Sequence, residues 1–531
     1  MSRRRIDIYD TTLRDGAQGE GISFSGGGKL KLARRLDAFG VDYIEGGFPG
    51  SNPKDMEFFR EVKSCGLKRA QVVAFGSMRR AKMTAATDPL IQSLLDAETQ
   101  VVTLYGKCWD LHVRDVLRVT PEQNLELIGD TIRLLREQGR TVMFDAEHFF
   151  DGYRARPEFA LEVLRTVREA GASVLVLCDT NGGSLPSEVY GVTKEIVSAF
   201  DVPVGIHTHN DGGVGVANTL EAVRAGASHV QGTINGYGER CGNANLCTII
   251  PNLELKLECE AVGVDSLRQL RELSLYVDDL VNVRPDSKAP YVGSSAFSHK
   301  AGAHVDGVRK NPKTFEHVPP EAVGNDRRFL VSELSGGSSI VAKAIEMGAG
   351  RQVSPEVSRE VLHALKELES RGYAFESADA SFRMLVQKVL KQHTPFFSLE
   401  GFRVMVEKRG KDQPCLSEAT VKVRVKDEVE LTVSEGDGPV NALDGALRKA
   451  LMRFYPEIAQ VHLTDFRVRI LDPEEATAAT TRVLIESSDG TDTWGTVGVS
   501  ENVIEASWEA LVDSVEYKLF REEERRREAG A

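Results

Sequence analysis

The sequence lacks an apolar run of about 18 residues, the length that a membrane-crossing helix requires. Its first residues, with Arg3, Arg4 and Arg5 ahead of the strand-like run 6–10, also lack the apolar core of a secretory signal. We therefore expect a cytoplasmic protein that has no membrane partner.

Cysteine is scarce and irregularly spaced. The 531 residues include seven cysteines, and no two of them form a C-x-x-C pair. This excludes a disulfide scaffold and gives no support to a zinc ribbon. Free thiols that are mostly buried are the expectation for a reducing compartment.

Basic residues are outnumbered: 66 Lys and Arg stand against 79 Asp and Glu, which gives a net charge of −13. So acidic a chain is a poor candidate for binding nucleic acid. The hydrophobic share of 41% and the charged share of 27% are typical of globular proteins. At roughly 150 residues per domain, the length allows three or four domains.

Short apolar runs, each followed by a longer amphipathic stretch, recur about every 30 to 35 residues in the first half of the chain. The runs are 6–9, 41–44, 71–75, 101–105, 141–144, 174–178, 203–207 and 230–234. Helical spacing of apolar residues marks stretches such as 29–39, 124–138, 159–170 and 216–225. The pattern predicts an α/β fold, a (β/α)₈ TIM barrel over residues 1–284. A doubly wound open sheet is the alternative, but evenly spaced units suit the barrel better.

The remainder of the chain changes character twice. Residues 285–397 are irregular and polar, with a glycine-rich stretch at 335–339 and one clear helix at 355–371, which indicates a helical linker region. Strand-like alternation at 419–425 and 429–433 precedes a helix at 439–454, and the same order returns with 481–487, 492–499 and 503–520. We predict a C-terminal α+β domain of two βββα units over 398–531. A single α+β domain with accidental internal similarity is the alternative.

Polar side chains stand where the predicted barrel strands end, and functional groups of such barrels gather there. His207 and His209 are two residues apart, so both project to one face of an extended strand. Together with Asp15, after the first strand, they suit a divalent cation such as Zn²⁺, Mn²⁺ or Co²⁺. Glu147 and Asn243 are predicted at the same barrel face. Two histidines in a polar turn without a metal are the alternative.

Three protein ligands leave open positions for a chelating 2-oxo acid, whose carbonyl the metal would polarise. Arg14, next to Asp15, could stabilise the alkoxide formed at that carbonyl, or could instead make a salt bridge at the barrel rim. Thr180 could bind the substrate carboxylate, or could only cap its own turn.

Three motifs carry a resemblance to a known family. Asp10-Thr-Thr-Leu-Arg-Asp-Gly16, His207-Thr-His-Asn-Asp211 and Gly238-Glu-Arg-Cys-Gly-Asn-Ala244 resemble the signatures of the acyl-CoA Claisen-condensing barrel enzymes, which include isopropylmalate, homocitrate and citramalate synthases. The resemblance covers essentially the whole chain. Segments 74–80, 105–113 and 327–336 look like the citramalate synthase branch.

This resemblance implies a reaction and its alternatives. Acetyl-CoA would join pyruvate, and thioester hydrolysis would release CoA and (R)-citramalate for isoleucine biosynthesis by the pyruvate route. An isopropylmalate synthase, which takes the bulkier 2-oxoisovalerate, is the rival, and Phe75, Leu104 and Tyr105 are the predicted pocket walls that would decide between them. A barrel that has lost its chemistry and only senses amino acids is a third reading.

The resemblance also implies roles for individual residues. Asp15, His207 and His209 match the family's metal positions, with Asn243 near them, for Mn²⁺, Zn²⁺, Co²⁺ or Mg²⁺. Arg14 and Thr180 match positions that hold the 2-oxo acid, and Glu147 and His304 match groups that enolise the acetyl methyl. The last of these lies in the linker region, which would complete the active site.

The C-terminal domain is similar to the family's regulatory domain, which implies a homodimer and an end-product effector, here isoleucine. A domain that only dimerises is the simpler reading.

Overall fold

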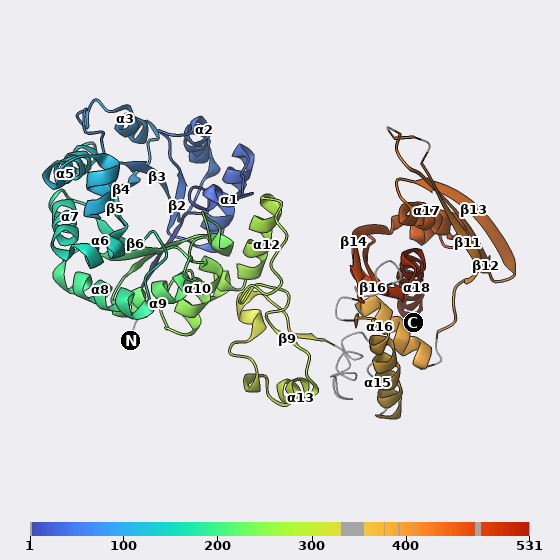
Figure 1. Cartoon of the computed structure of the whole chain (residues 1–531). Coiled ribbons are helices and arrows are strands. Elements are labelled where there is room, and N and C mark those ends of the chain that lie inside the picture. The colour runs from blue at the N-terminus through green and yellow to red at the C-terminus, as the bar shows by residue number, and fades with distance from the viewer. Residues whose placement is uncertain are drawn as a thin grey trace. The chain divides into compact units, whose positions relative to one another are not determined.

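A computed structural model describes residues 3–330, 355–375, 378–390, 393–408, 410–411, 413–472 and 479–529. The glycine-rich stretch at 335–339 and residues 331–336 of the branch-like segment lie outside this set. The chain divides into two compact units, Met1–Phe297 with Val318–Arg327, and Ser298–His317 with Arg328–Ala531 (Figure 1).

The first unit is the predicted barrel. Eight parallel strands form a closed sheet in sequence order, and β8 pairs with β1 to complete it. The strands are β1 (Asp7–Asp10), β2 (Tyr43–Gly47), β3 (Gln71–Ser77), β4 (Val101–Lys107), β5 (Thr141–Glu147), β6 (Val174–Asp179), β7 (Val204–Thr208) and β8 (His229–Gly232). The (β/α)₈ prediction is confirmed.

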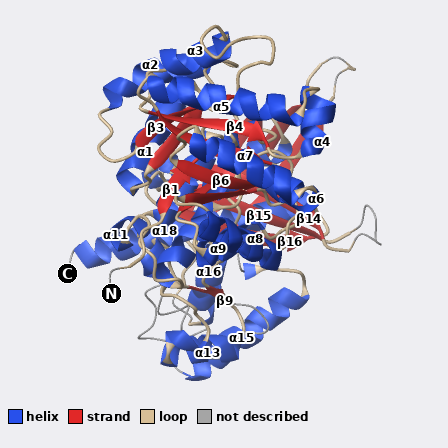
Figure 2. Ribbon diagram, turned by 90° about the vertical axis from the view of Figure 1, so that its left-hand side faces the viewer, coloured by secondary structure: helices blue, strands red, loops and turns tan. Residues whose placement is uncertain are grey.

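Helices cover the outside of the barrel, and Figure 2 shows helices, drawn blue, beside the barrel strands β3 and β4, drawn red. They are α1 (Gly26–Phe39), α2 (Pro53–Glu61), α3 (Pro89–Asp96), α4 (Asp110–His112), α5 (Pro121–Glu137), α6 (Phe149–Ala155), α7 (Pro157–Glu169), α8 (Pro186–Ala199), α9 (Gly215–Ala225), α10 (Leu246–Leu255), α11 (Val264–Leu267) and α12 (Leu270–Leu280). Capping hydrogen bonds mark where two of these helices begin. Ser25 accepts a hydrogen bond from the Gly28 amide, and Thr120 forms a reciprocal capping box with Gln123.

Alternation along each strand divides its side chains between two environments. On β4, Leu104 belongs to the apolar layer between strands and helices, whereas its neighbour Tyr105 faces a cavity inside the barrel. On β5, Phe144 and Asp145 divide in the same way. The apolar layer stabilises the barrel, and the inward positions are thereby available for polar groups.

The second unit contains the predicted duplication. Antiparallel strands β11 (Ser398–Glu407), β12 (Leu416–Val425) and β13 (Glu428–Gly436) precede α17 (Pro439–Leu451), and β14 (His462–Ile470), β15 (Thr481–Ser488) and β16 (Thr493–Ser500) precede α18 (Val503–Ala529). Buried residues of both repeats, including Val421, Leu447, Val483 and Leu511, form one hydrophobic cluster. The α+β prediction with two βββα units is confirmed.

The same unit includes β9 (Ser298–His299) paired with β10 (Arg328–Phe329), and the helices α13 (Gly302–Lys310), α15 (Pro355–Ser370) and α16 (Asp379–Val389). Within the described part of the chain, no helix is both long and apolar enough to cross a bilayer. The 27 residues of α18 have the length but are rich in charged side chains.

Candidate metal and active site at the ends of the barrel strands

A cavity of about 570 Å³ lies at the carboxyl ends of the barrel strands. Its lining includes many of the residues predicted for the site: Arg14, Asp15, Phe75, Tyr105, Glu147, Thr180, His207 and His209. These residues come from six different strands or the loops after them, so closure of the barrel brings together groups that are far apart in sequence.

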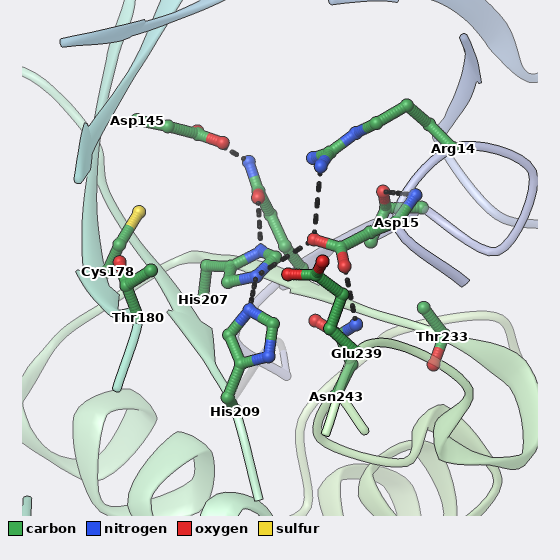
Figure 3. Close-up of polar contacts among 12 residues, drawn as sticks. Arg14, Asp15, Asp145, Cys178, Thr180, His207, His209, Thr233, Glu239 and Asn243 are labelled. Atoms are coloured by element: carbon green, nitrogen blue, oxygen red, sulfur yellow. Dashed lines mark hydrogen bonds and ion pairs between the residues drawn. The ribbon is translucent and has the colours of Figure 1, made fainter. Parts of the chain in front are cut away.

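Asp15, His207 and His209 form a buried group, and their ligand atoms all lie within 4.8 Å of one another. The two Nε2 atoms are 3.4 Å apart, and His207 Nε2 is 3.5 Å from Asp15 Oδ2 (Figure 3). Two imidazole lone pairs at this separation repel unless a proton or a cation lies between them. Nitrogen and carboxylate donors in this arrangement fit a divalent metal ion.

Unpartnered polar atoms around the group support this fit. Asn243 donates from Nδ2 to Asp15 Oδ1 and to the Tyr237 carbonyl, each at 3.0 Å, so its Oδ1 is left without a hydrogen-bond partner among the described residues. The side chain is buried, and buried polar atoms without partners are uncommon. Asn243 Oδ1 is therefore free to accept a further contact, and its place as a metal ligand stays a prediction.

The charges of the group also suit a cation. Burial by itself would raise the pKa of Asp15, but Arg14, His207 and His209 outweigh that effect and lower the pKa to about 2. Burial, assisted by the neighbouring His207, lowers the pKa of His209 to about 4. At neutral pH the carboxylate is ionised and this imidazole is neutral, which are the forms that bind metal.

Arg14 is held rigidly beside this group. Its Nε donates to Glu45 Oε2 at 2.6 Å, its Nη1 donates to Asp15 Oδ2 at 3.1 Å, and its guanidinium carbon lies 3.7 Å from the centre of the Phe75 ring. Burial opposes the charge of Arg14, but Glu45 and Asp15 outweigh burial and raise its pKa. The cation is thus pre-oriented at the cavity wall.

Glu45 is a site residue that sequence reasoning missed. It is fully buried on β2 and accepts hydrogen bonds from Tyr9 and Thr11 as well as from Arg14. A signal for Glu45 was present in the sequence, because an acidic residue directly follows the apolar run 41–44. The predicted strand ended at residue 44, however, and so left Glu45 out. A buried charge of this kind requires a partner, and Arg14 supplies it.

The predicted pocket walls lie in two different places. Phe75 stacks on Tyr105 with ring centres 5.3 Å apart, and Phe48 meets Phe75 edge-on, so all three form an aromatic wall of the cavity. Leu104 instead lies in the helix-facing apolar layer, because adjacent residues of a strand point to opposite faces. Thr180 lines the cavity, and its hydroxyl oxygen accepts from the His148 amide at 2.9 Å, which leaves the hydroxyl hydrogen for a ligand.

The two predicted enolising residues belong to different units. Glu147 ends β5 and lines the cavity, where it forms an ion pair with Lys107 at the end of β4, another residue that sequence reasoning missed. His304 lies on α13 in the second unit, with its ring 4.3 Å from the ring of Phe315. Its part in the reaction stays a prediction.

Comparison with known proteins defines the family. Residues 5–274 match the HMGL-like family model. The (R)-citramalate synthase of Geobacter sulfurreducens is 52% identical over 519 residues, which cover 98% of each chain. The chain belongs to the citramalate synthase family.

Other citramalate synthases agree with this assignment. That of Aquifex aeolicus is 50% identical over 98% of this chain and 99% of its own. The 2-isopropylmalate synthase of Methanocaldococcus jannaschii is 30% identical over 98% of this chain and 96% of its own. The predicted family and its citramalate synthase branch are therefore confirmed, and membership of an enzyme family contradicts the reading of a barrel without chemistry.

Two further family models match the part of this citramalate synthase family protein that follows the barrel. Residues 291–373 match the "Homocitrate synthase post-HMGL domain-like" model, and residues 376–519 match the "LeuA allosteric (dimerisation) domain" model. The second match agrees with the predicted regulatory character of the C-terminal domain.

Proposed function

We propose that the chain is an (R)-citramalate synthase, which condenses acetyl-CoA with pyruvate and hydrolyses the thioester to give (R)-citramalate and CoA. The observation that carries this proposal is the buried Asp15, His207 and His209 group with the fixed guanidinium of Arg14 beside it. Full-length similarity to citramalate synthases supports the choice of reaction.

The oxo acid would be bound by the cation site, Arg14 and Thr180. A divalent cation such as Mn²⁺, Zn²⁺, Co²⁺ or Mg²⁺, held by Asp15, His207 and His209 with Asn243 beside them, would supply Lewis-acid polarisation of the pyruvate carbonyl. Arg14 would stabilise the negative charge that develops on the carbonyl oxygen. The hydroxyl hydrogen of Thr180 would bind the pyruvate carboxylate.

Enolisation of acetyl-CoA would begin at Glu147. Its carboxylate would take a proton from the acetyl methyl group, and the resulting enolate carbon would attack the pyruvate carbonyl carbon. The alkoxide would then take up a proton equivalent to the one that Glu147 removed. Water would cleave the thioester, with its hydroxyl going to the acyl carbon and its hydrogen to the sulfur of the leaving CoA. Lys107 would hold the carboxylate of Glu147 in place, and His304 would assist the proton transfer.

For the chain as a whole we propose a catalytic barrel at 1–284, a linker at 285–397 that completes the site, and a regulatory domain at 398–531. The match to an allosteric dimerisation model supports a homodimer, and the end product of the proposed route, isoleucine, is the proposed effector.

One assay tests the proposed reaction. Thiol release from acetyl-CoA is measured with Mn²⁺ present and with pyruvate, 2-oxoisovalerate or 2-oxoglutarate as the acceptor. Pyruvate is expected to be preferred by at least about 100-fold in kcat/KM, because the proposed aromatic wall of Phe75 and Tyr105 would exclude the branch of a larger acceptor. Preference for 2-oxoisovalerate would assign the chain to isopropylmalate synthesis, and no release with any acceptor would refute the enzyme.

Replacing Glu147 with glutamine is expected to lower kcat by about 10²- to 10⁴-fold, because the amide cannot accept the methyl proton. Affinity for Mn²⁺ should stay unchanged, since Glu147 is not in the cation group. Glu122→Gln, an exposed change on α5, is the control and should behave as wild type. Wild-type turnover in Glu147→Gln would show that the base is another group.

A further inference from the structure

Gln231 connects two walls of the barrel interior. It lies on β8 and is fully buried, and its amide reaches both His207 on β7 and Asp145 on β5. Gln231 Oε1 is 2.9 Å from His207 Nδ1, and Gln231 Nε2 donates to Asp145 Oδ1 at 3.0 Å. Asp145 and His207, which Figure 3 labels, each take part in one of these two contacts. Sequence reasoning assigns no role to Gln231 or Asp145.

The direction of these two hydrogen bonds follows from the cation group. His207 turns Nε2 toward Asp15 and His209, so metal binding requires a lone pair on that nitrogen and a hydrogen on Nδ1. The Nδ1 hydrogen needs an acceptor, and Gln231 Oε1 occupies that place. The amide hydrogens of Gln231 must then face an acceptor on their own side, and Asp145 Oδ1 supplies it.

We propose that Asp145 and Gln231 are positioning residues that fix the tautomer and the ring orientation of His207 for metal binding. This inference rests on the metal site in the proposed function and extends it by one layer of residues. Such outer partners orient a ligating imidazole and increase its basicity. The arrangement works with Asp145 ionised or neutral, because the carbonyl oxygen of a carboxylic acid accepts a hydrogen bond as well.

Co²⁺ binding to the metal-free protein, followed by its visible absorption and by calorimetry, tests the proposal. Gln231→Leu removes the acceptor for His207 and should weaken Co²⁺ binding about 10- to 100-fold. The double variant Asp145→Asn with Gln231→Glu reverses the bond between positions 145 and 231, keeps an acceptor for His207 and keeps one carboxyl group in the pair. It should bind Co²⁺ within about threefold of wild type.

Two controls separate this role from general support of the fold. Thr103→Val removes a buried partner of the Tyr9 hydroxyl elsewhere in the barrel interior and should leave Co²⁺ affinity unchanged. In the metal-free wild type labelled with ¹⁵N-histidine, His207 should carry its hydrogen on Nδ1, which nitrogen chemical shifts report without any substitution.

The possible results distinguish a failure of this positioning role from a failure of the proposed metal site. Three results would each overturn this positioning role while the metal site stands: wild-type Co²⁺ affinity in Gln231→Leu, a double variant that folds but binds as weakly as Gln231→Leu, or a neutral His207 whose only hydrogen is on Nε2. If the wild type binds no Co²⁺, or if His209→Ala does not abolish that binding, the proposed metal site itself is refuted. The positioning role of Gln231 and Asp145 is then refuted with it.

Discussion

Replacing His209 with alanine is expected to abolish metal binding and to lower kcat by at least about 10³-fold, while the barrel stays folded. His209 supplies one of the three ligand atoms of the buried group, and two remaining protein ligands would hold a cation poorly. Lewis-acid polarisation contributes several kcal/mol, and each 1.36 kcal/mol corresponds to a tenfold change in rate.

The fold should tolerate this change. The imidazole Nδ1 of His209 has no hydrogen-bond partner among the described residues, so truncation breaks no bond at that atom. The free energy of unfolding of the metal-free protein should change by less than about 2 kcal/mol. Thiol release, Co²⁺ titration and urea denaturation of the same preparation measure the three quantities.

His462→Ala is the matched control, since this histidine is exposed on β14 in the other unit. It should leave metal binding and kcat unchanged. Full turnover by His209→Ala in metal-free buffer would remove the metal from the proposed mechanism, whatever the control does.

Replacing Arg14 with glutamine is expected to impair both catalysis and stability, for separate reasons. The reacting oxygen would lose its cation, which should lower kcat by about 10²- to 10³-fold. Glu45 would keep a fully buried charge without its guanidinium partner, which should cost about 3 to 5 kcal/mol in the free energy of unfolding.

A second substitution separates the two effects. In the double variant Arg14→Gln with Glu45→Gln, the unpaired buried charge is gone, and glutamine can still bond to Tyr9 and Thr11. Most of the lost stability should therefore return while kcat stays low. Urea denaturation and thiol release, measured on wild type, both single variants and the double variant, complete the cycle.

Recovery of activity in the double variant would show that Arg14 acts only by neutralising Glu45. An unchanged free energy of unfolding in Arg14→Gln would show that Glu45 does not need Arg14 as its partner.

Repeated patterns and local chemistry were readable from the sequence. Eight apolar runs at regular spacing predicted the barrel, since strands and helices each show their own period of apolar residues along the chain. The metal candidates were readable because barrels place strand ends together at one face, so Asp15, His207 and His209 could be grouped without coordinates. The cavity brings these three residues together at one end of the barrel.

The sequence could not show which side chains pair with each other across the barrel interior. Gln231 and Asp145 are 86 residues apart on strands that are not neighbours, and only the closed sheet brings their side chains together. Glu45 follows the apolar run 41–44 and Lys107 ends β4, but neither position tells which side chain will be the partner. Leu104, predicted at the pocket, faces the helices because strand alternation gives the inward position to Tyr105.

The sequence by itself determined the barrel, the duplicated C-terminal domain and the polar residues at the carboxyl ends of the barrel strands, because periodicity and motif spacing are properties of the chain. Only the tertiary structure decided which groups support these residues: Glu45 behind Arg14, Lys107 beside Glu147, and Gln231 with Asp145 behind His207. The reason is physical, since a buried polar group is stable only with a partner, and closure of the sheet chooses the partner.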